Sequence, residues 1–199
     1  MSSMLKHTDQ QKSLLREVLT DMLSLLQAQR WNYQTSHWQS QGEPFYGDHL
    51  MFQRLYESLD ADIDGLAEKI LGLLVMPGDD AYPFDNTTQA TKLSQWLESW
   101  NVFDCPYKRS LQSERDMQTL WARGYEVLKD TGSLSLGLDD WVMSTASAHE
   151  TNLYLLQQRM HAQDHMRKAS QDLTRAWYLK PSSSRRGREF HAAEDKESD

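Results

Sequence analysis

The chain has 199 residues, of which 39% are hydrophobic, and this is enough for one domain with a packed core. Its formal net charge of −8 argues against a surface that binds nucleic acid strongly. A single cysteine, Cys105, excludes an internal disulfide framework and suits a reducing compartment. The sequence has no run of eighteen apolar residues and no apolar N-terminal stretch, so we expect no membrane span, no secretory signal and a cytoplasmic location.

Long stretches rich in helix-forming residues alternate with shorter breaks, and all five prolines fall in those breaks. Apolar residues recur within the stretches at helical spacing, and no stretch alternates as a β-strand does. The predicted helices cover residues 8–39, 46–75, 92–100, 108–129 and 138–162. Four long helices, with a short helix in a long crossover connection, are typical of an all-α, ferritin-like four-helix bundle rather than a simple up-and-down bundle.

The helical pattern weakens after Ala162, so we divide the chain into a bundle, residues 1–163, and a C-terminal extension, residues 164–199. Residues 164–180 have the pattern of an amphipathic helix, and the Ser-, Arg- and Glu-rich remainder is expected to be disordered. Five basic and five acidic residues from Lys180 onward cancel. Because DNA affinity grows with each phosphate that a protein neutralises, this tail should bind DNA poorly, although many copies in one assembly would add avidity.

Four residues with metal-ligating side chains follow the spacing H-x11-H-x14-D-x3-E: His37, His49, Asp64 and Glu68. Asp64 and Glu68 are four residues apart, so on a helix they share one face. His49 precedes Asp64 by fifteen residues, roughly 22 Å along a helix, whereas metal–ligand bonds span only about 2 Å. One subunit therefore cannot close the site. A second, antiparallel copy can, because a two-fold axis carries the histidine end of one helix onto the carboxylate end of the other.

The spacing alone is also compatible with purely structural roles for these four residues. His37 falls on the apolar stripe of the first helix and could be an ordinary core histidine. Acidic residues such as Asp64 and Glu68 on a second helical face are most often a solvated surface. However, His37 ends one helix and His49 begins the next, so a short connection should bring the two rings together.

Three segments resemble the ferroxidase signature of the Dps family of miniferritins: Ser36-His37-Trp38, Asp48-His49-Leu50-Met51-Phe52 and Asp64-Gly65-Leu66-Ala67-Glu68-Lys69-Ile70. A weaker likeness over residues 149–156 extends the resemblance to about residues 8–162. The resemblance implies a hollow homododecamer in which His37 and His49 of one subunit face the two carboxylates of its two-fold mate. It further implies a ferroxidase that oxidises Fe(II), preferably with hydrogen peroxide, and stores the ferric iron inside the shell.

The chain departs from the family pattern at Gln53, where most family members carry an acidic residue four positions after the second histidine. A neutral amide is a poorer iron ligand, so the second iron of each pair should bind weakly. Ala146 stands where a ferritin would place the glutamate preceding His149, and this argues against an intrasubunit ferritin site. Trp38 is compatible with electron donation and with packing. Asp140 is compatible with an acidic three-fold pore and with a favourable helix-dipole contact.

Two function classes follow. The first is an enzyme that oxidises and stores iron and protects against oxidative damage. The alternative is a structural or nucleoid-associated shell that keeps the fold but has weak ferroxidase activity, which the neutral Gln53 favours. A stand-alone helical bundle that binds another metal is a more remote third reading, and its native mass would distinguish it.

Overall fold

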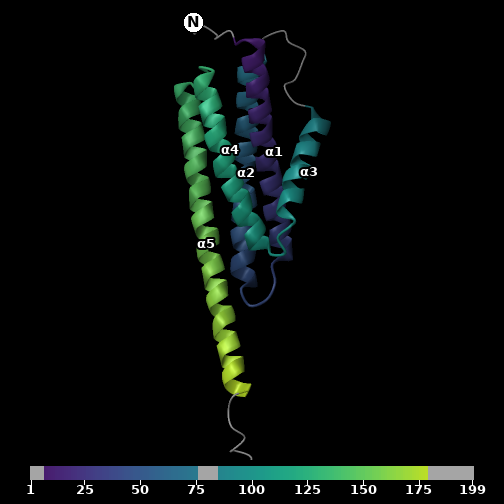
Figure 1. Cartoon of the computed structure of the whole chain (residues 1–199), viewed down its shortest axis with the longest axis vertical. Coiled ribbons are helices and arrows are strands. Elements are labelled where there is room, and N and C mark those ends of the chain that lie inside the picture. Colours follow the sequence, from purple (N-terminus) through teal and green to yellow (C-terminus); the bar gives the residue numbers. More distant parts are fainter. Residues whose placement is uncertain (1–6, 76–84, 179–199) are drawn as a thin grey trace, which may run out of the picture. The chain divides into compact units, whose positions relative to one another are not determined.

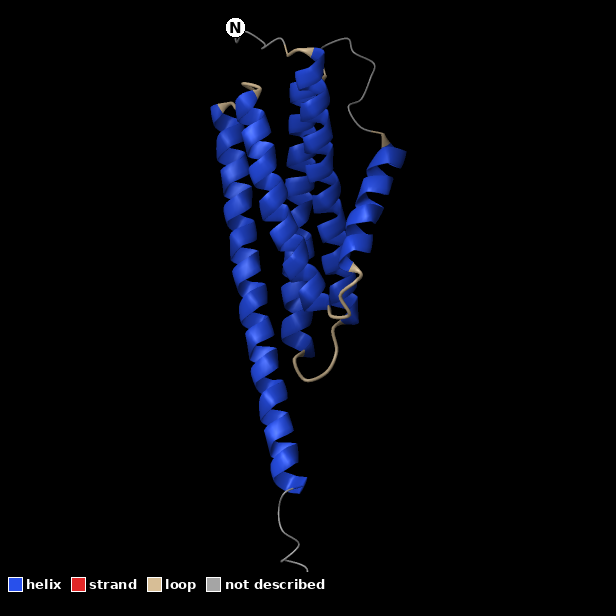
Figure 2. Ribbon diagram, viewed as in Figure 1, coloured by secondary structure: helices blue, strands red, loops and turns tan. Residues whose placement is uncertain are grey.

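The computed structural model describes residues 7–75 and 85–178, which form five α-helices and contain no strand (Figures 1 and 2). The helices are α1 (Asp9–Gln39), α2 (Phe45–Leu74), α3 (Asn86–Trp100), α4 (Pro106–Asp130) and α5 (Leu136–Tyr178). The predicted all-α class is therefore confirmed. The four long helices are α1, α2, α4 and α5, and the short α3 belongs to the connection between α2 and α4, as predicted.

Local sequence signals fix where the helices begin. Thr8 caps α1 in a capping box, in which its hydroxyl accepts from the Gln11 N–H at 3.2 Å and the Gln11 side chain accepts from the Thr8 N–H at 2.9 Å. Asp85 caps α3 by accepting from two backbone N–H groups, which explains why α3 begins six residues before the predicted position 92. The connection between α1 and α2 turns at Gly42, whose φ of 83° favours glycine.

Helix α1 lies at the centre of the bundle and packs against α2, α3 and α4. Its apolar face is fully buried, and each large side chain on it contributes roughly 1.5–3 kcal/mol through burial. Gly124 allows α4 to approach α1 closely, because a Cβ added there would lie 2.4 Å from the sulfur of Met22. The buried apolar residues of α1 are Leu15, Val18, Leu19, Met22, Leu23, Leu25, Leu26, Ala28 and Tyr33.

A buried polar cluster joins α1, α4 and α5. The hydroxyl of Tyr33 donates to one carboxylate oxygen of Glu114 at 2.5 Å, and Nδ1 of His149 donates to the other at 2.7 Å. All three side chains are buried, and burial, followed by the neighbouring Glu114, raises the pKa of Tyr33 well above its usual range. Because a buried carboxylate without partners would be costly, these two donors are needed to keep Glu114 inside the bundle.

The chain divides into two compact units, Met1–Met160 and His161–Asp199, and α5 belongs to both. Residues 164–178, for which the sequence allows a separate amphipathic helix, continue α5 without a break. The predicted disorder after Pro181 and the predicted weak DNA binding of the tail concern residues outside the described part of the chain. Within the described ranges, no helix is both long enough and apolar enough to cross a membrane.

Candidate metal centre

His37 and His49 lie against each other where α1 ends and α2 begins. Their rings stack with centroids 3.6 Å apart and planes inclined by 25°. The short connection that turns at Gly42 brings them together, so the predicted pairing of these two residues is confirmed. Their role as metal ligands stays a prediction. We call this pair the histidine half-site.

The hydrogen bonds of the histidine half-site define which ring nitrogens are free. Nδ1 of His37 lies 2.9 Å from the backbone oxygen of His49, and Nδ1 of His49 lies 3.2 Å from the backbone oxygen of His37. Because a carbonyl oxygen only accepts, each Nδ1 must carry the proton. In the neutral ring Nε2 then has an unprotonated lone pair, which is the state that binds a metal ion.

Two aromatic rings orient the histidine half-site further. Phe45 stacks on His49 with centroids 5.0 Å apart, and the rings of Tyr56 and His37 make a T-shaped contact with centroids 5.4 Å apart. Both histidines are only partly exposed. The rings are therefore held in place before any ligand binds, which lowers the entropy cost of forming a site.

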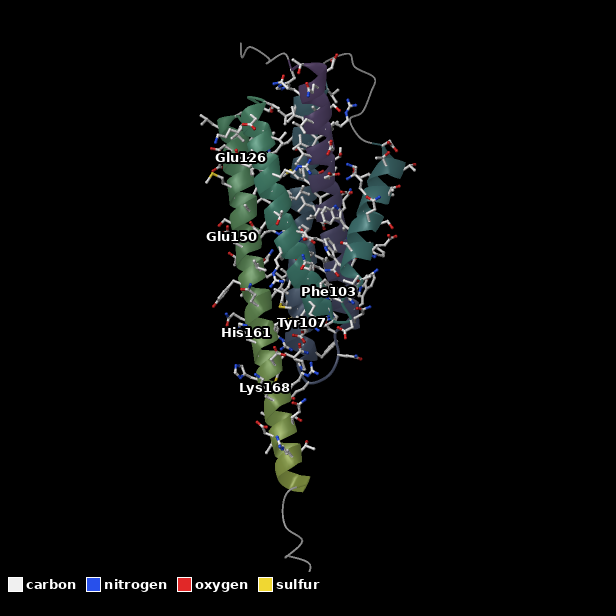
Figure 3. The ribbon with its side chains drawn as sticks, viewed as in Figure 1. Phe103, Tyr107, Glu126, Glu150, His161 and Lys168 are labelled. Atoms are coloured by element: carbon white, nitrogen blue, oxygen red, sulfur yellow. The ribbon has the colours of Figure 1, made fainter. Side chains whose placement is uncertain are left out.

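A buried ion pair anchors the first turn of α2 on α5. Arg159 donates from Nε to one oxygen of Asp48 at 2.6 Å and from a terminal nitrogen to the other at 3.0 Å. Its guanidinium also lies 5.2 Å from the ring centroid of Tyr107, which is in the first turn of α4 (Figure 3). Burial, followed by the neighbouring Asp48, raises the pKa of Tyr107. Asp48 directly precedes His49, so this contact fixes the backbone that carries one predicted ligand.

The sequence gives no local signal for this ion pair. Asp48 and Arg159 are 111 residues apart, and no spacing pattern in the sequence connects them. An acidic residue in the first turn of a helix is common for reasons of helix polarity alone. Only the packing of α5 on α2 reveals that the buried Asp48 has a charged partner.

Asp64 and Glu68 are both exposed on α2 and lie one helical turn apart, as predicted. Asp60, one turn earlier, forms a salt bridge with Arg30 of α1 and is thereby partly neutralised. We call Asp64 and Glu68 the carboxylate pair. Because α2 is unbroken from Phe45 to Leu74, the carboxylate pair begins roughly 22 Å along the helix axis from His49.

The four predicted ligands therefore do not come together within one chain. Among the residues that the structure describes, no three or more His, Cys, Asp or Glu side chains are grouped so that they could hold a metal ion. Gln53, on the turn of α2 after His49, donates from its amide nitrogen to Glu57 at 2.8 Å. Its amide is thus engaged along the helix by a neighbouring carboxylate.

Exposed aromatic side chains surround the histidine half-site. Trp38 is 62% exposed and packs edge-on against Trp31, which is 50% exposed, with centroids 6.3 Å apart. Phe45 and Leu50 are also exposed, and Tyr46 is 72% exposed. Trp38 is therefore not a core residue of this chain. Exposed apolar side chains at the end of α1 and the start of α2 make this end of the bundle a candidate interface.

No family model matches the chain, and no curated protein matches its sequence. Solved structures do match it in fold. A Dps protein from Vibrio cholerae O1, described as a member of a broad superfamily of ferritin-like diiron-carboxylate proteins, superposes with a TM-score of 0.64 at 21% identity, over 80% of this chain and 96% of the other.

Two further Dps structures agree with this result. Dps from Thermosynechococcus elongatus gives a TM-score of 0.60 at 18% identity, over 76% of this chain and 92% of the other. Dps from Microbacterium arborescens, solved in its high iron form, gives a TM-score of 0.58 at 17% identity, over 79% of this chain and 99% of the other. The chain therefore has the ferritin-like four-helix fold of the Dps proteins, and the resemblance inferred from residues 36–70 is confirmed at the level of the fold.

Proposed function

We propose that this protein oxidises Fe(II) at sites shared between two subunits and stores the ferric product inside a closed shell, a dodecamer as in the Dps family. The observation that carries this proposal is the histidine half-site, in which both Nδ1 atoms are engaged by backbone oxygens. Two neutral imidazoles with available Nε2 atoms are suitable ligands for Fe(II).

An antiparallel second copy supplies the remaining ligands. The point midway along α2 between His49 and the centre of the carboxylate pair falls between Glu57 and Ser58. A two-fold axis at this point places the histidine half-site of each subunit against the carboxylate pair of the other, so that a dimer contains two complete sites. The exposed aromatic residues around the histidine half-site support this interface, because a partner subunit would bury them.

The combined ligand set suits the proposed reaction. Imidazoles favour Fe(II), carboxylates favour the harder Fe(III) product, and four protein ligands leave positions for the oxidant. Two Fe(II) ions reduce one molecule of hydrogen peroxide to two molecules of water when two protons are taken up, and this two-electron step releases no hydroxyl radical. The descriptions of two structural neighbours as a ferritin-like diiron-carboxylate protein and as a high-iron form support iron as the substrate.

Other parts of the proposal rest on the sequence. Asp140, exposed near the start of α5, is our candidate for an acidic iron-entry pore. We propose a cytoplasmic location. DNA binding has no support from the described residues, because it depends on tails that they do not include. The second candidate function is a structural shell with weak ferroxidase activity, and the engagement of Gln53 with Glu57 favours it.

Incubation of the full chain with Fe(II) and hydrogen peroxide separates the two candidates. Rapid growth of ferric absorbance that is lost in His49→Ala and in Asp64→Ala supports the ferroxidase. A closed shell of high native mass with no oxidation above the uncatalysed rate supports the structural shell. A monomer at micromolar concentration contradicts both, since one chain cannot complete the site.

A further inference from the structure

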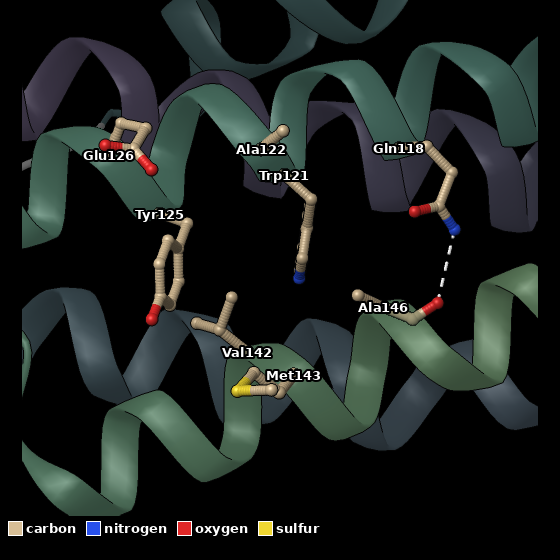
Figure 4. Close-up of a pocket in the computed structure, with 8 residues that line it drawn as sticks. All are labelled: Gln118, Trp121, Ala122, Tyr125, Glu126, Val142, Met143 and Ala146. Carbon is tan, nitrogen blue, oxygen red and sulfur yellow. Dashed lines mark hydrogen bonds between the residues drawn. The ribbon is translucent and has the colours of Figure 1, made fainter.

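The first part of α5 is held to the rest of the bundle by polar contacts. The amide nitrogen of Gln118 on α4 donates to the backbone oxygen of Ala146 at 3.2 Å (Figure 4). Further along α5, His149 and Arg159 each donate to a buried carboxylate. These side chains are engaged within the fold and are not available to a ligand from solution.

Two histidines that follow in α5 have a different environment. His161 and His165 are both exposed, and they begin the second compact unit, His161–Asp199. They are four residues apart on an unbroken helix, so their side chains lie on one face with Cβ atoms about 5–6 Å apart. The nitrogens of exposed rings face water, which a metal ion can displace. The pair is therefore accessible to a metal ion from solution.

Two imidazoles at this spacing can chelate one metal ion. Metal–nitrogen bonds measure about 2.0–2.1 Å, so an ion held between the two side chains can bond to one nitrogen of each ring. The same spacing places the two zinc-binding histidines of the H-E-x-x-H metalloprotease motif on one helical face. Among the described residues, no third His, Cys, Asp or Glu completes a group of metal ligands here. The pair is thus a two-ligand site that leaves other positions of the ion to water.

Charged neighbours of the two histidines have opposite signs. Asp164 directly precedes His165 and lies three residues after His161, so it is on the same side of the helix. Lys168 lies three residues after His165 and adds a positive charge (Figure 3). Both charged side chains are exposed, so water and salt screen them. The affinity for a cation therefore depends on direct bonds to the two rings rather than on the local net charge.

We propose that His161 and His165 form a surface site for one divalent transition-metal ion of the Cu²⁺ or Ni²⁺ type. Imidazole nitrogens bind these ions in preference to Mg²⁺ and Ca²⁺, which favour oxygen ligands. Cu²⁺ and Ni²⁺ also bind nitrogen ligands more tightly than Fe²⁺ does, and both accept a tetragonal geometry, in which two neighbouring positions suit a pair of imidazoles. The site therefore selects ions other than the proposed iron substrate, and it uses none of the four predicted iron ligands.

Titration calorimetry of the full-length protein with Ni²⁺, in a buffer that does not bind metal ions, tests the proposal. The decisive variant is His165→Met/Met166→His, which keeps the composition but moves the second imidazole one position along α5. Positions 161 and 166 are about 140° apart around a helix, so one ion cannot bond to both rings. Positions 165 and 166 are both exposed, so the fold should not change. One Ni²⁺-binding step per chain should become about tenfold weaker or more, because the second ring no longer binds intramolecularly.

Two further variants separate this site from the histidine half-site. His161→Ala removes one ring and should weaken the same Ni²⁺-binding step. His37→Ala/His49→Ala removes the predicted iron ligands of α1 and α2 and should leave that step unchanged. Hydrogen exchange gives a second readout. Because an ion that bridges one helical turn stabilises it, backbone amides near residues 161–165 should exchange more slowly with Ni²⁺ present, and only where both histidines are in place.

Three results would overturn the proposal. The first is no saturable binding of Ni²⁺. The second is equal Ni²⁺ affinity and stoichiometry in the unmodified protein and in His165→Met/Met166→His. The third is loss of the Ni²⁺-binding step in His37→Ala/His49→Ala, which would assign that step to the histidine half-site. None of these results decides whether the protein oxidises iron, because the proposal does not rest on that activity.

Discussion

The guanidinium of Arg159 and the carboxylate of Asp48 form a two-point ion pair, with bonds of 2.6 and 3.0 Å, one residue before His49. Asp48 is almost fully buried, and Arg159 supplies a hydrogen bond to each of its carboxylate oxygens. The pair links α5 to the first turn of α2. It therefore contributes both to the stability of the bundle and to the position of a predicted metal ligand.

Removal of Arg159 should be strongly destabilising. Arg159→Ala leaves the buried carboxylate of Asp48 without its cation and should lower the free energy of unfolding by about 3 kcal/mol or more. Urea denaturation measures this change. Arg123→Ala is the matched control, because the Arg123–Glu17 pair is more than half exposed on both sides and should be worth at most about 1 kcal/mol. An equal loss of unfolding free energy in the two variants would show that the Arg159–Asp48 pair stabilises the fold no more than an exposed pair does.

Local sequence signals explain how much of the structure could be predicted. Helical periodicity and the prolines gave the helices, and the short connection at Gly42 gave the contact between His37 and His49. Contacts between residues that are distant in the sequence leave no local pattern from which they could be predicted. The Tyr33–Glu114 bond spans 81 residues, and a glutamate or tyrosine in a helix has no pattern that reveals its partner on another helix.

The inter-subunit part of the candidate site could be predicted from geometry but not tested in one chain. A continuous α2 fixes the separation between His49 and Asp64, and the short reach of a metal bond then requires a second copy. The carboxylate pair is exposed in a single chain. Exposed carboxylates become half of a metal site only when a partner subunit brings further ligands to them.

Alkaline pH should weaken the bundle through Tyr33. Burial and Glu114 raise the pKa of Tyr33 in the folded state, so above about pH 10 the unfolded chain loses this proton while the folded chain keeps it. The folded state then binds more protons, and stability falls as pH rises, by at most about 1.4 kcal/mol per pH unit for one group.

Tyr33→Phe isolates this contribution. It should be less stable than the unmodified protein at pH 8, because Glu114 loses a hydrogen-bond donor. Between pH 9 and about pH 11 its stability should fall less steeply. Urea midpoints across this range measure both effects. Parallel curves for the two proteins would show that Tyr33 does not titrate differently in the folded and unfolded states.

Complementation between defective subunits should restore activity. A His37→Ala/His49→Ala double variant lacks the histidine half-site, and an Asp64→Ala/Glu68→Ala double variant lacks the carboxylate pair. Each alone should lose rapid Fe(II) oxidation while remaining assembled. After equal amounts are unfolded and refolded together, half of the dimers are mixed, and each mixed dimer has one complete site. About a quarter of the sites, and of the activity, should therefore return.

The readout for this exchange is ferric absorbance after addition of Fe(II) and hydrogen peroxide, with mass spectrometry to verify that mixed dimers formed. The matched control combines the two variants as native assemblies, without unfolding and refolding, so that no mixed dimers form. If mixed dimers are present and no activity returns, the site is not shared between subunits in the proposed way.

Gln53 should limit the second iron of each site. It lies one helical turn after His49, and its amide contributes no negative charge to a site that receives two dications. Its nitrogen is engaged by Glu57, so the amide is also held along the helix. We expect one tight and one weak metal ion per site. Gln53→Asp adds an anionic oxygen, and should raise the affinity for the second ion about tenfold or more and speed peroxide-driven oxidation.

Calorimetric titration with Zn²⁺, a redox-inert substitute for Fe(II), resolves the two binding steps. Gln53→Asn is the matched control: its side chain has the length of Asp and releases Glu57, but it remains neutral, so the second step should stay weak. A gain in Gln53→Asn equal to that in Gln53→Asp would assign the effect to the freed Glu57 carboxylate. Two equally tight steps in the unmodified protein would show that another group, already present at the interface, provides the anionic ligand that Gln53 lacks.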